Sequence, residues 1–173
     1  MAYSVNLGGK EIPLRYTMAE LADMEETLGT VETTEEQFFK GRKRSRNLAA
    51  AIRIMGNAGL KAAGKEPDLT DENVLERMKP GQLRQYQIAV MGTITDAFRM
   101  ETEEESTRDL TLEEIEKKKY GCRLTYRRIV SYGLIAGLAY PEMQQLTPGL
   151  VLDAYILRRN YDDVMHGIRR GDE

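Results

Sequence analysis

A polar, acidic stretch in the second half of the sequence limits how this chain can fold. Residues 101–108 read Glu-Thr-Glu-Glu-Glu-Ser-Thr-Arg and contain no apolar side chain that could join a core. A segment without apolar anchors is typical of a linker between folded regions. The chain of 173 residues is long enough for two small domains. The sequence therefore predicts a domain over residues 1–100, an acidic linker over residues 101–110 and a second region over residues 111–173.

The first sixteen residues alternate apolar and polar side chains as a β-hairpin does. The apolar positions on the two sides of a glycine pair are Val5, Leu7, Ile12 and Leu14. Gly8 and Gly9 can adopt the positive φ angles that a two-residue hairpin turn requires. Pro13 has no N–H group for a strand ladder, so the second strand is expected to lie at an edge or to end early.

Apolar residues in the rest of the chain recur at helical spacing, and several helices have recognisable start signals. Capping boxes, in which a Thr is followed three residues later by Glu or Gln, begin at Thr17, Thr34 and Thr111. The expected helices cover residues 18–28, a short segment around Phe38 and Phe39, and residues 45–63, 71–78, 83–100, 112–136 (with an interruption near Gly121), 140–146 and 148–168. We expect a mainly α fold, in which an amino-terminal β-hairpin is followed by a helical bundle and a second small helical region.

The helix expected over residues 45–63 is rich in small residues. Ala51, Gly59 and Ala62 share one face of it, and small side chains let two helix backbones approach closely. We expect this face to support weak, concentration-dependent self-association.

The sequence offers few residues for catalysis or metal binding. It contains one histidine, His166, and one cysteine, Cys122, which excludes a Cys/His zinc site and an intrachain disulfide. No P-loop and no dinucleotide-binding glycine motif is present. The composition leaves open a site built from carboxylates alone. We expect a protein that is not an enzyme, with no catalytic residue, no metal ligand and no cofactor.

Charge and hydropathy restrict the expected partners and compartment. The net charge is −3 and the isoelectric point about 5.4, whereas a general nucleic-acid binder usually carries a basic surplus. The most apolar stretch, residues 129–138, is too short to span a bilayer, and we see no signal peptide. Together with the single cysteine, these features favour a cytoplasmic protein with neither a membrane nor a nucleic acid as its partner.

Two segments are candidate surfaces for binding another protein. The first is a basic run over residues 40–46, with Arg42, Lys43, Arg44 and Arg46 as its candidate contacts. This run could instead be a solvated loop, or it could bind phosphates in a small helical regulatory or nucleic-acid-associated protein. The second is the turn after Gly137, which brings together Leu138, Tyr140, Pro141 and Met143. In the alternative interpretation these apolar residues only cap a small core.

Two regions of the chain resemble tail assembly chaperones of long-tailed bacteriophages and prophages. Residues 6–18 and 24–29 are similar to the amino-terminal hairpin and helix of that family, with a glycine turn, a Lys-x-Ile-Pro-Leu strand and a helix that ends in Leu-Gly. Residues 137–149, with Gly-Leu, Glu-Met and Leu-Thr-Pro-Gly in that order, resemble the carboxyl-terminal extension of the longer form of such chaperones. In that family the extension is often joined by programmed ribosomal frameshifting, whereas here both parts lie in one chain.

The resemblance implies a non-catalytic role in tail morphogenesis. Such chaperones bind the long tape measure protein, keep it soluble and help to recruit tail tube subunits. They act in the cytoplasm of the bacterial host cell and are absent from the mature virion. The resemblance also assigns client binding to the amino-terminal part and recruitment of tube subunits to the extension.

Overall fold

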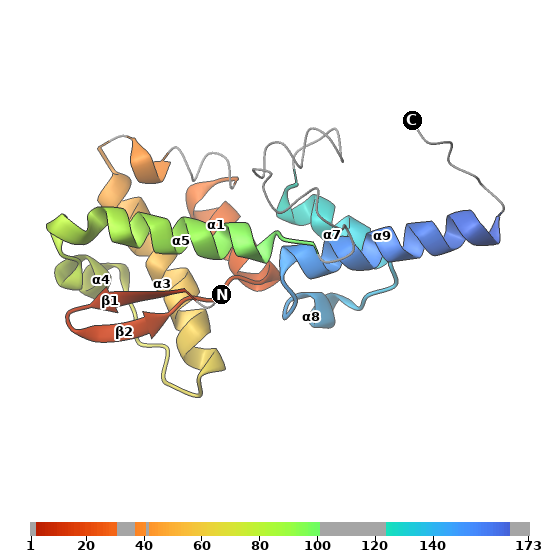
Figure 1. The fold of residues 1–173 in the computed structure, drawn as a ribbon. Helices are drawn as coiled ribbons and strands as arrows, with labels where there is room; N and C mark the ends of the chain where they lie inside the picture. The colour runs from red at the N-terminus through yellow and green to blue at the C-terminus, as the bar shows by residue number, and fades with distance from the viewer. Residues whose placement is uncertain (1–2, 31–36, 41, 101–123, 167–173) are drawn as a thin grey trace. The chain divides into compact units, whose positions relative to one another are not determined.

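A computed structural model describes residues 3–30, 37–40, 42–100 and 124–166 (Figure 1). The chain divides into two compact units, Met1–Ala97 and Phe98–Glu173. The predicted linker at residues 101–110, the capping boxes that begin at Thr34 and Thr111, and Cys122 lie outside the described residues. The described part is mainly helical and begins with a two-stranded antiparallel hairpin, so the predicted fold class is confirmed.

The hairpin forms as its alternation predicts. Strand β1 (Ser4–Leu7) pairs with β2 (Lys10–Pro13), and the turn residues Gly8 and Gly9 have φ angles of 60° and 90°. Pro13 lies opposite Ser4, and the next residue's N–H donates to the Tyr3 carbonyl at 2.9 Å. Hydrogen-bonded and non-hydrogen-bonded residue pairs alternate along an antiparallel ladder. The Ser4–Pro13 pair is of the non-hydrogen-bonded kind, so the backbone nitrogen of Pro13 faces away from β1. The proline therefore removes no hydrogen bond from this hairpin.

Helix α1 (Met18–Leu28) begins and ends at the predicted residues. The N–H of Thr17 donates to Glu20 Oε2 at 2.8 Å, and the Thr17 hydroxyl donates to the same carboxylate. Gly29 ends the helix with a φ angle of 90°, which is unfavourable for residues with a Cβ atom. The helix buries Met18, Leu21 and Met24.

Helix α3 (Arg44–Ala62) is the centre of the first unit and contacts α1, β2, α4 and α5. Its glycines allow the hairpin to approach closely. A methyl group added at Gly56 would lie 2.6 Å from Leu69 Cδ1, and one added at Gly59 would overlap the carbonyl group of Pro13. The N–H of Arg15 also donates to the Met55 carbonyl of this helix at 3.0 Å. The small-residue face at Gly59 is therefore covered by the chain's own hairpin.

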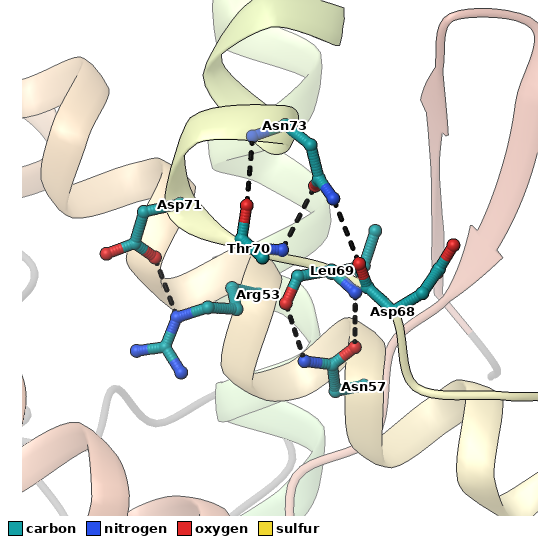
Figure 2. Close-up of polar contacts among 7 residues, drawn as sticks. All are labelled: Arg53, Asn57, Asp68, Leu69, Thr70, Asp71 and Asn73. Carbon is teal, nitrogen blue, oxygen red and sulfur yellow. Dashed lines mark hydrogen bonds and ion pairs between the residues drawn. The ribbon is translucent and has the colours of Figure 1, made fainter.

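The connection from α3 to α4 (Asp71–Arg77) is held by side-chain amides (Figure 2). Asn57 donates to the Leu69 carbonyl and accepts from the Leu69 N–H, both at 3.0 Å. Thr70 and Asn73 exchange hydrogen bonds at the start of α4, so Thr70 caps this helix, which begins at the expected residue 71. The ion pair between Arg53 and Asp71 spans 2.7 Å, but both side chains are partly exposed. An exposed pair of this kind contributes little, so the two part-buried hydrogen bonds of Asn57 do most to hold the loop.

Tyr86 connects the hairpin to the last helices of the first unit. A short 3-10 turn, η1 (Pro80–Gln82), leads into α5 (Leu83–Ala97), which lies against β1 and α3. The buried Tyr86 hydroxyl lies 3.1 Å from the Asn6 carbonyl and 3.0 Å from Gln82 Oε1, and it accepts from the Lys79 N–H at 3.3 Å. One phenol thus joins three separate segments.

The second unit contains α7 (Tyr126–Ile135), α8 (Tyr140–Met143) and α9 (Pro148–Met165). Helix α7 packs on both α8 and α9. It ends at Gly137, whose φ angle of 88° allows the Leu138 N–H to reach the Gly133 carbonyl at 2.9 Å. This is a Schellman cap, and it agrees with the predicted stop at Gly137. None of the helices in the described ranges is long and apolar enough to cross a membrane.

A substitution at Gly59 tests the close approach of α3 to the hairpin. Gly59→Ala should give a net loss in the free energy of unfolding of about 1–2 kcal/mol, because overpacking against Pro13 outweighs the gain in helix propensity. Gly81→Ala is the matched control, since an added methyl group there has no neighbour within 4 Å. Urea unfolding followed by circular dichroism measures both variants, and equal stabilities would contradict the proposed contact.

Tyr16 gives a second test, because its buried hydroxyl makes no hydrogen bond among the described residues. Tyr16→Phe should raise the free energy of unfolding by about 1 kcal/mol at neutral pH. Burial, followed by the charges of Glu25 and Glu20, raises the pKa of Tyr16 above its ordinary value. The unfolded chain loses this proton at a lower pH than the folded chain does. The free energy of unfolding of the wild type therefore has its full value below pH about 10 and falls as the pH rises further. The advantage of Tyr16→Phe in the free energy of unfolding should therefore widen above pH 10, and an advantage that stays constant with pH would contradict this prediction.

Candidate protein-binding surfaces

Only some residues of the predicted binding surface after Gly137 are exposed. Tyr140 and Pro141 are exposed and Leu138 is half-buried, but Met143 is fully buried. A methyl group at Gly133 would collide with Met143 Sδ and would lie 2.9 Å from Val151 Cγ1. The absence of a side chain at Gly133 thus opens the space that Met143 fills. The prediction that Met143 contacts a partner is wrong, because this residue belongs to the core of the second unit.

Tyrosine hydroxyls fix α8 against α7. The hydroxyls of Tyr126 and Tyr140 lie 2.8 Å apart, and Gln144 Nε2 donates to Tyr126 at 3.0 Å. Burial, and then the hydrogen bond to Tyr140, raise the pKa of Tyr126. The Tyr126 hydroxyl therefore stays protonated at neutral pH, and its contact with the Tyr140 hydroxyl can hold the Tyr140 ring at the surface.

Helix α9 has apolar residues on two faces. One face is buried through Val151 and Leu152, and its Tyr155 stacks on Tyr132 of α7 with ring centroids 4.5 Å apart. The other face carries an exposed apolar stripe made of Leu150, Ala154, Leu157, Tyr161 and Met165. The four large side chains of the stripe are 43%, 57%, 58% and 64% exposed in chain order, and Ala154 is half-buried. Their spacing of three, four or seven residues places them on one side of the helix.

Exposed apolar side chains are concentrated in the second unit. Within the described residues, seven of the nine exposed large apolar side chains lie there: Leu134, Ile135, Tyr140, Leu150, Leu157, Tyr161 and Met165. The first unit contributes only Phe39 and Ile88. An apolar surface of this kind is typical of a protein-binding site.

Sequence reasoning missed Leu134, Ile135 and the stripe on α9. The spacing of the stripe is visible in the sequence, but α9 has a second apolar row at similar spacing. The sequence cannot show which of the two rows is covered by α7.

Two charges beside the stripe are paired with each other. Arg158 Nε lies 3.2 Å from Asp162 Oδ2, and the Arg158 guanidinium lies 5.9 Å from the centre of the Tyr161 ring. His166 follows at the exposed end of the helix.

The basic run lies at the start of α3 in the first unit. Its described cations are all exposed, and they are Lys40, Arg42, Lys43, Arg44 and Arg46. None of them forms an ion pair among the described residues, and the N-cap residue Lys43 supplies no side-chain cap. The structure therefore leaves these side chains accessible to an anionic partner.

A polar hollow of about 400 Å³ lies beside β1. It is lined by Ser4, Val5, Asn6, Glu11, Gln82, Gln85 and Tyr86. Ser4 Oγ donates to Glu11 Oε1, and the Tyr86 hydroxyl bonds the Asn6 carbonyl. In the described ranges, no group of three or more His, Cys, Asp or Glu side chains could hold a metal ion.

The chain matches no protein-family model, no curated protein and no solved structure. Inferences about its function therefore rest on its own residues and on the resemblance described above.

Truncation of Met143 separates the core of the second unit from its surface. Met143→Ala should destabilise α7 and α9 by about 2–4 kcal/mol, because it leaves a cavity beneath Gly133. Leu134→Ala, at a side chain that is 55% exposed, should change stability by less than about 0.5 kcal/mol. Amide hydrogen exchange in α7 and α9 reports this unit separately. Equal protection in the two variants would show that Met143 does not anchor the unit.

Proposed function

We propose that this protein is a non-catalytic tail assembly chaperone of a long-tailed bacteriophage or prophage. In this role it binds the tape measure protein through its first unit and recruits tail tube subunits through its second unit. It acts in the cytoplasm of the bacterial host and is left out of the mature virion.

The observation that carries the proposal is the uneven distribution of exposed apolar side chains. Seven of the nine in the described residues lie on the second unit, which also has its own buried core around Ile129, Met143 and Leu152. A unit with its own core can present a binding surface without unfolding the rest of the chain. A unit of this kind suits the capture of a protein subunit.

The first unit supports the proposal through the resemblance. The hairpin and helix over residues 4–28 follow one another in the order that the resemblance implies. The motifs of the resemblance include the Gly8-Gly9 turn of the hairpin and Gly29 at the end of α1. The proposal agrees with a sequence that holds no recognisable catalytic motif.

A nucleic-acid-associated role is the second candidate, and one observation favours it. The five described cations at residues 40–46 are exposed and form no ion pair among the described residues. Binding through phosphates would weaken steeply with salt. A salt-dependent mobility shift with DNA that is lost when Arg42, Lys43 and Arg44 become Gln would favour this role over the chaperone.

Truncation after Arg108 tests the division of labour. The remaining first part should stay soluble and bind the tape measure protein encoded beside it, but it should no longer capture tail tube subunits in a pull-down. Capture by the truncated protein as efficient as capture by the full chain would contradict the assignment.

A point substitution in the intact chain tests the same assignment in case the truncated protein misfolds. Ile135→Glu, at a side chain that is 62% exposed, should weaken capture of tube subunits at least about tenfold. Ile88→Glu in the first unit, at a side chain that is 58% exposed, is the control and should leave that capture unchanged.

A further inference from the structure

We propose that the exposed stripe of α9 is the interface of a homodimer, in which α9 pairs antiparallel with α9 of a second copy. The stripe consists of Leu150, Ala154, Leu157, Tyr161 and Met165. This inference goes beyond the proposed function, because it concerns how the chain meets itself. It assigns the four large side chains of the stripe to a second copy and leaves Leu134, Ile135 and Tyr140 as the exposed apolar residues for a client.

Part of the distal half of α9 is exposed on every side. Five consecutive residues, 157–161, are all exposed, and five residues cover every side of an α-helix. Most helical stability in proteins comes from tertiary packing of an apolar face. The distal turns therefore need a partner, and Figure 1 shows α9 continuing past α7 within this unit.

A second copy fits the stripe because the stripe is complementary to itself. Consider an antiparallel pair whose two-fold axis passes between Leu157 and Arg158. Leu150 of one copy then lies level with Met165 of the other, and the small Ala154 lies level with the large Tyr161. Two-fold interfaces require such self-complementarity, since the same patch is used by both copies.

The charges near the stripe also fit a second copy better than a charged partner. Arg158 and Arg159 are followed by Asp162 and Asp163, so the formal charges of this helix segment cancel. Arg158 and Asp162 already pair with each other at 3.2 Å. No surplus charge beside the stripe would select an acidic or a basic partner. A parallel, in-register pair would set like charges level with one another, which favours the antiparallel arrangement.

The size of the stripe predicts a weak dimer. The exposed parts of four large apolar side chains amount to roughly 400 Å² in each copy, or about 800 Å² in the pair, below the 1,200 Å² of small stable interfaces. The small-residue face of α3, expected from the sequence to support self-association, is unavailable at Ala51 and Gly59 because both are buried. Self-association is therefore expected through α9, at micromolar or higher concentrations.

Sedimentation equilibrium of the full chain from about 10 µM to 1 mM tests the interface. The wild type should shift from monomer to dimer over this range, and Leu157→Glu should raise the dissociation constant at least tenfold. Ile88→Glu is the matched control, because it adds the same charge at a side chain of almost the same exposure, 58% against 57%. A wild type that remains monomeric at 1 mM would overturn the proposal, and so would equal effects of the two substitutions. Circular dichroism would establish that both variants remain helical.

Cysteine cross-linking in a Cys122→Ser background tests the register. Leu157→Cys should form a disulfide-linked dimer on air oxidation, because the two positions lie almost level across the proposed axis. Leu150→Cys should not cross-link to itself, since in this register its two copies are separated by about 22 Å along the helix. A mixture of Leu150→Cys and Met165→Cys chains should yield the mixed dimer. Efficient Leu150→Cys homodimers would indicate a parallel pair and would overturn the arrangement.

Discussion

The close approach of α3 to the outer edge of β2 is the constraint on which the first unit depends. A two-stranded hairpin is at best marginally stable in water and needs a helix or further strands to cover it. Here Gly56 and Gly59 bring the helix backbone against Ile12 and Pro13, and the N–H after Leu14 bonds the Met55 carbonyl. Pro13 contributes by lacking a donor on the edge that the helix covers. Any side chain at Gly59 would force these two elements apart.

The second unit also depends on a glycine that allows close packing, but it leaves one apolar helix face uncovered. Gly133 lets Met143 and Val151 pack closely on α7, so a core forms from a few short helices. A unit of this size has little interior volume, and a helix as long as α9 presents more apolar surface than α7 and α8 can cover. The uncovered stripe is therefore a direct consequence of a long two-faced helix in a small unit, and it makes this unit suited to binding protein.

Particular elements show how far local sequence signals reach. The hairpin, the stops at Gly29 and Gly137, and the cap at Thr70 follow from the conformational freedom of glycine and from the hydrogen bonds of short polar side chains. These signals act within a few residues, so the sequence displays them fully. The assignment of Met143 to a surface failed because its burial depends on Gly133, ten positions earlier. The bonds from Asn57 to Leu69 and from Tyr86 to Asn6 were not predicted for the same reason.

The sequence by itself determined the elements of this protein, because helical spacing, strand alternation, caps and glycine stops are properties of neighbouring residues. It also supplied the basic run as a candidate surface, and it contained both apolar rows of α9 without showing which of them would be exposed. Only the tertiary structure decided which apolar face is covered. The sequence of α3 contains a face of small residues, and the sequence of α9 contains two apolar rows at similar spacing. Which of them meets the hairpin or α7, and which remains exposed, depends on contacts between residues far apart in the chain.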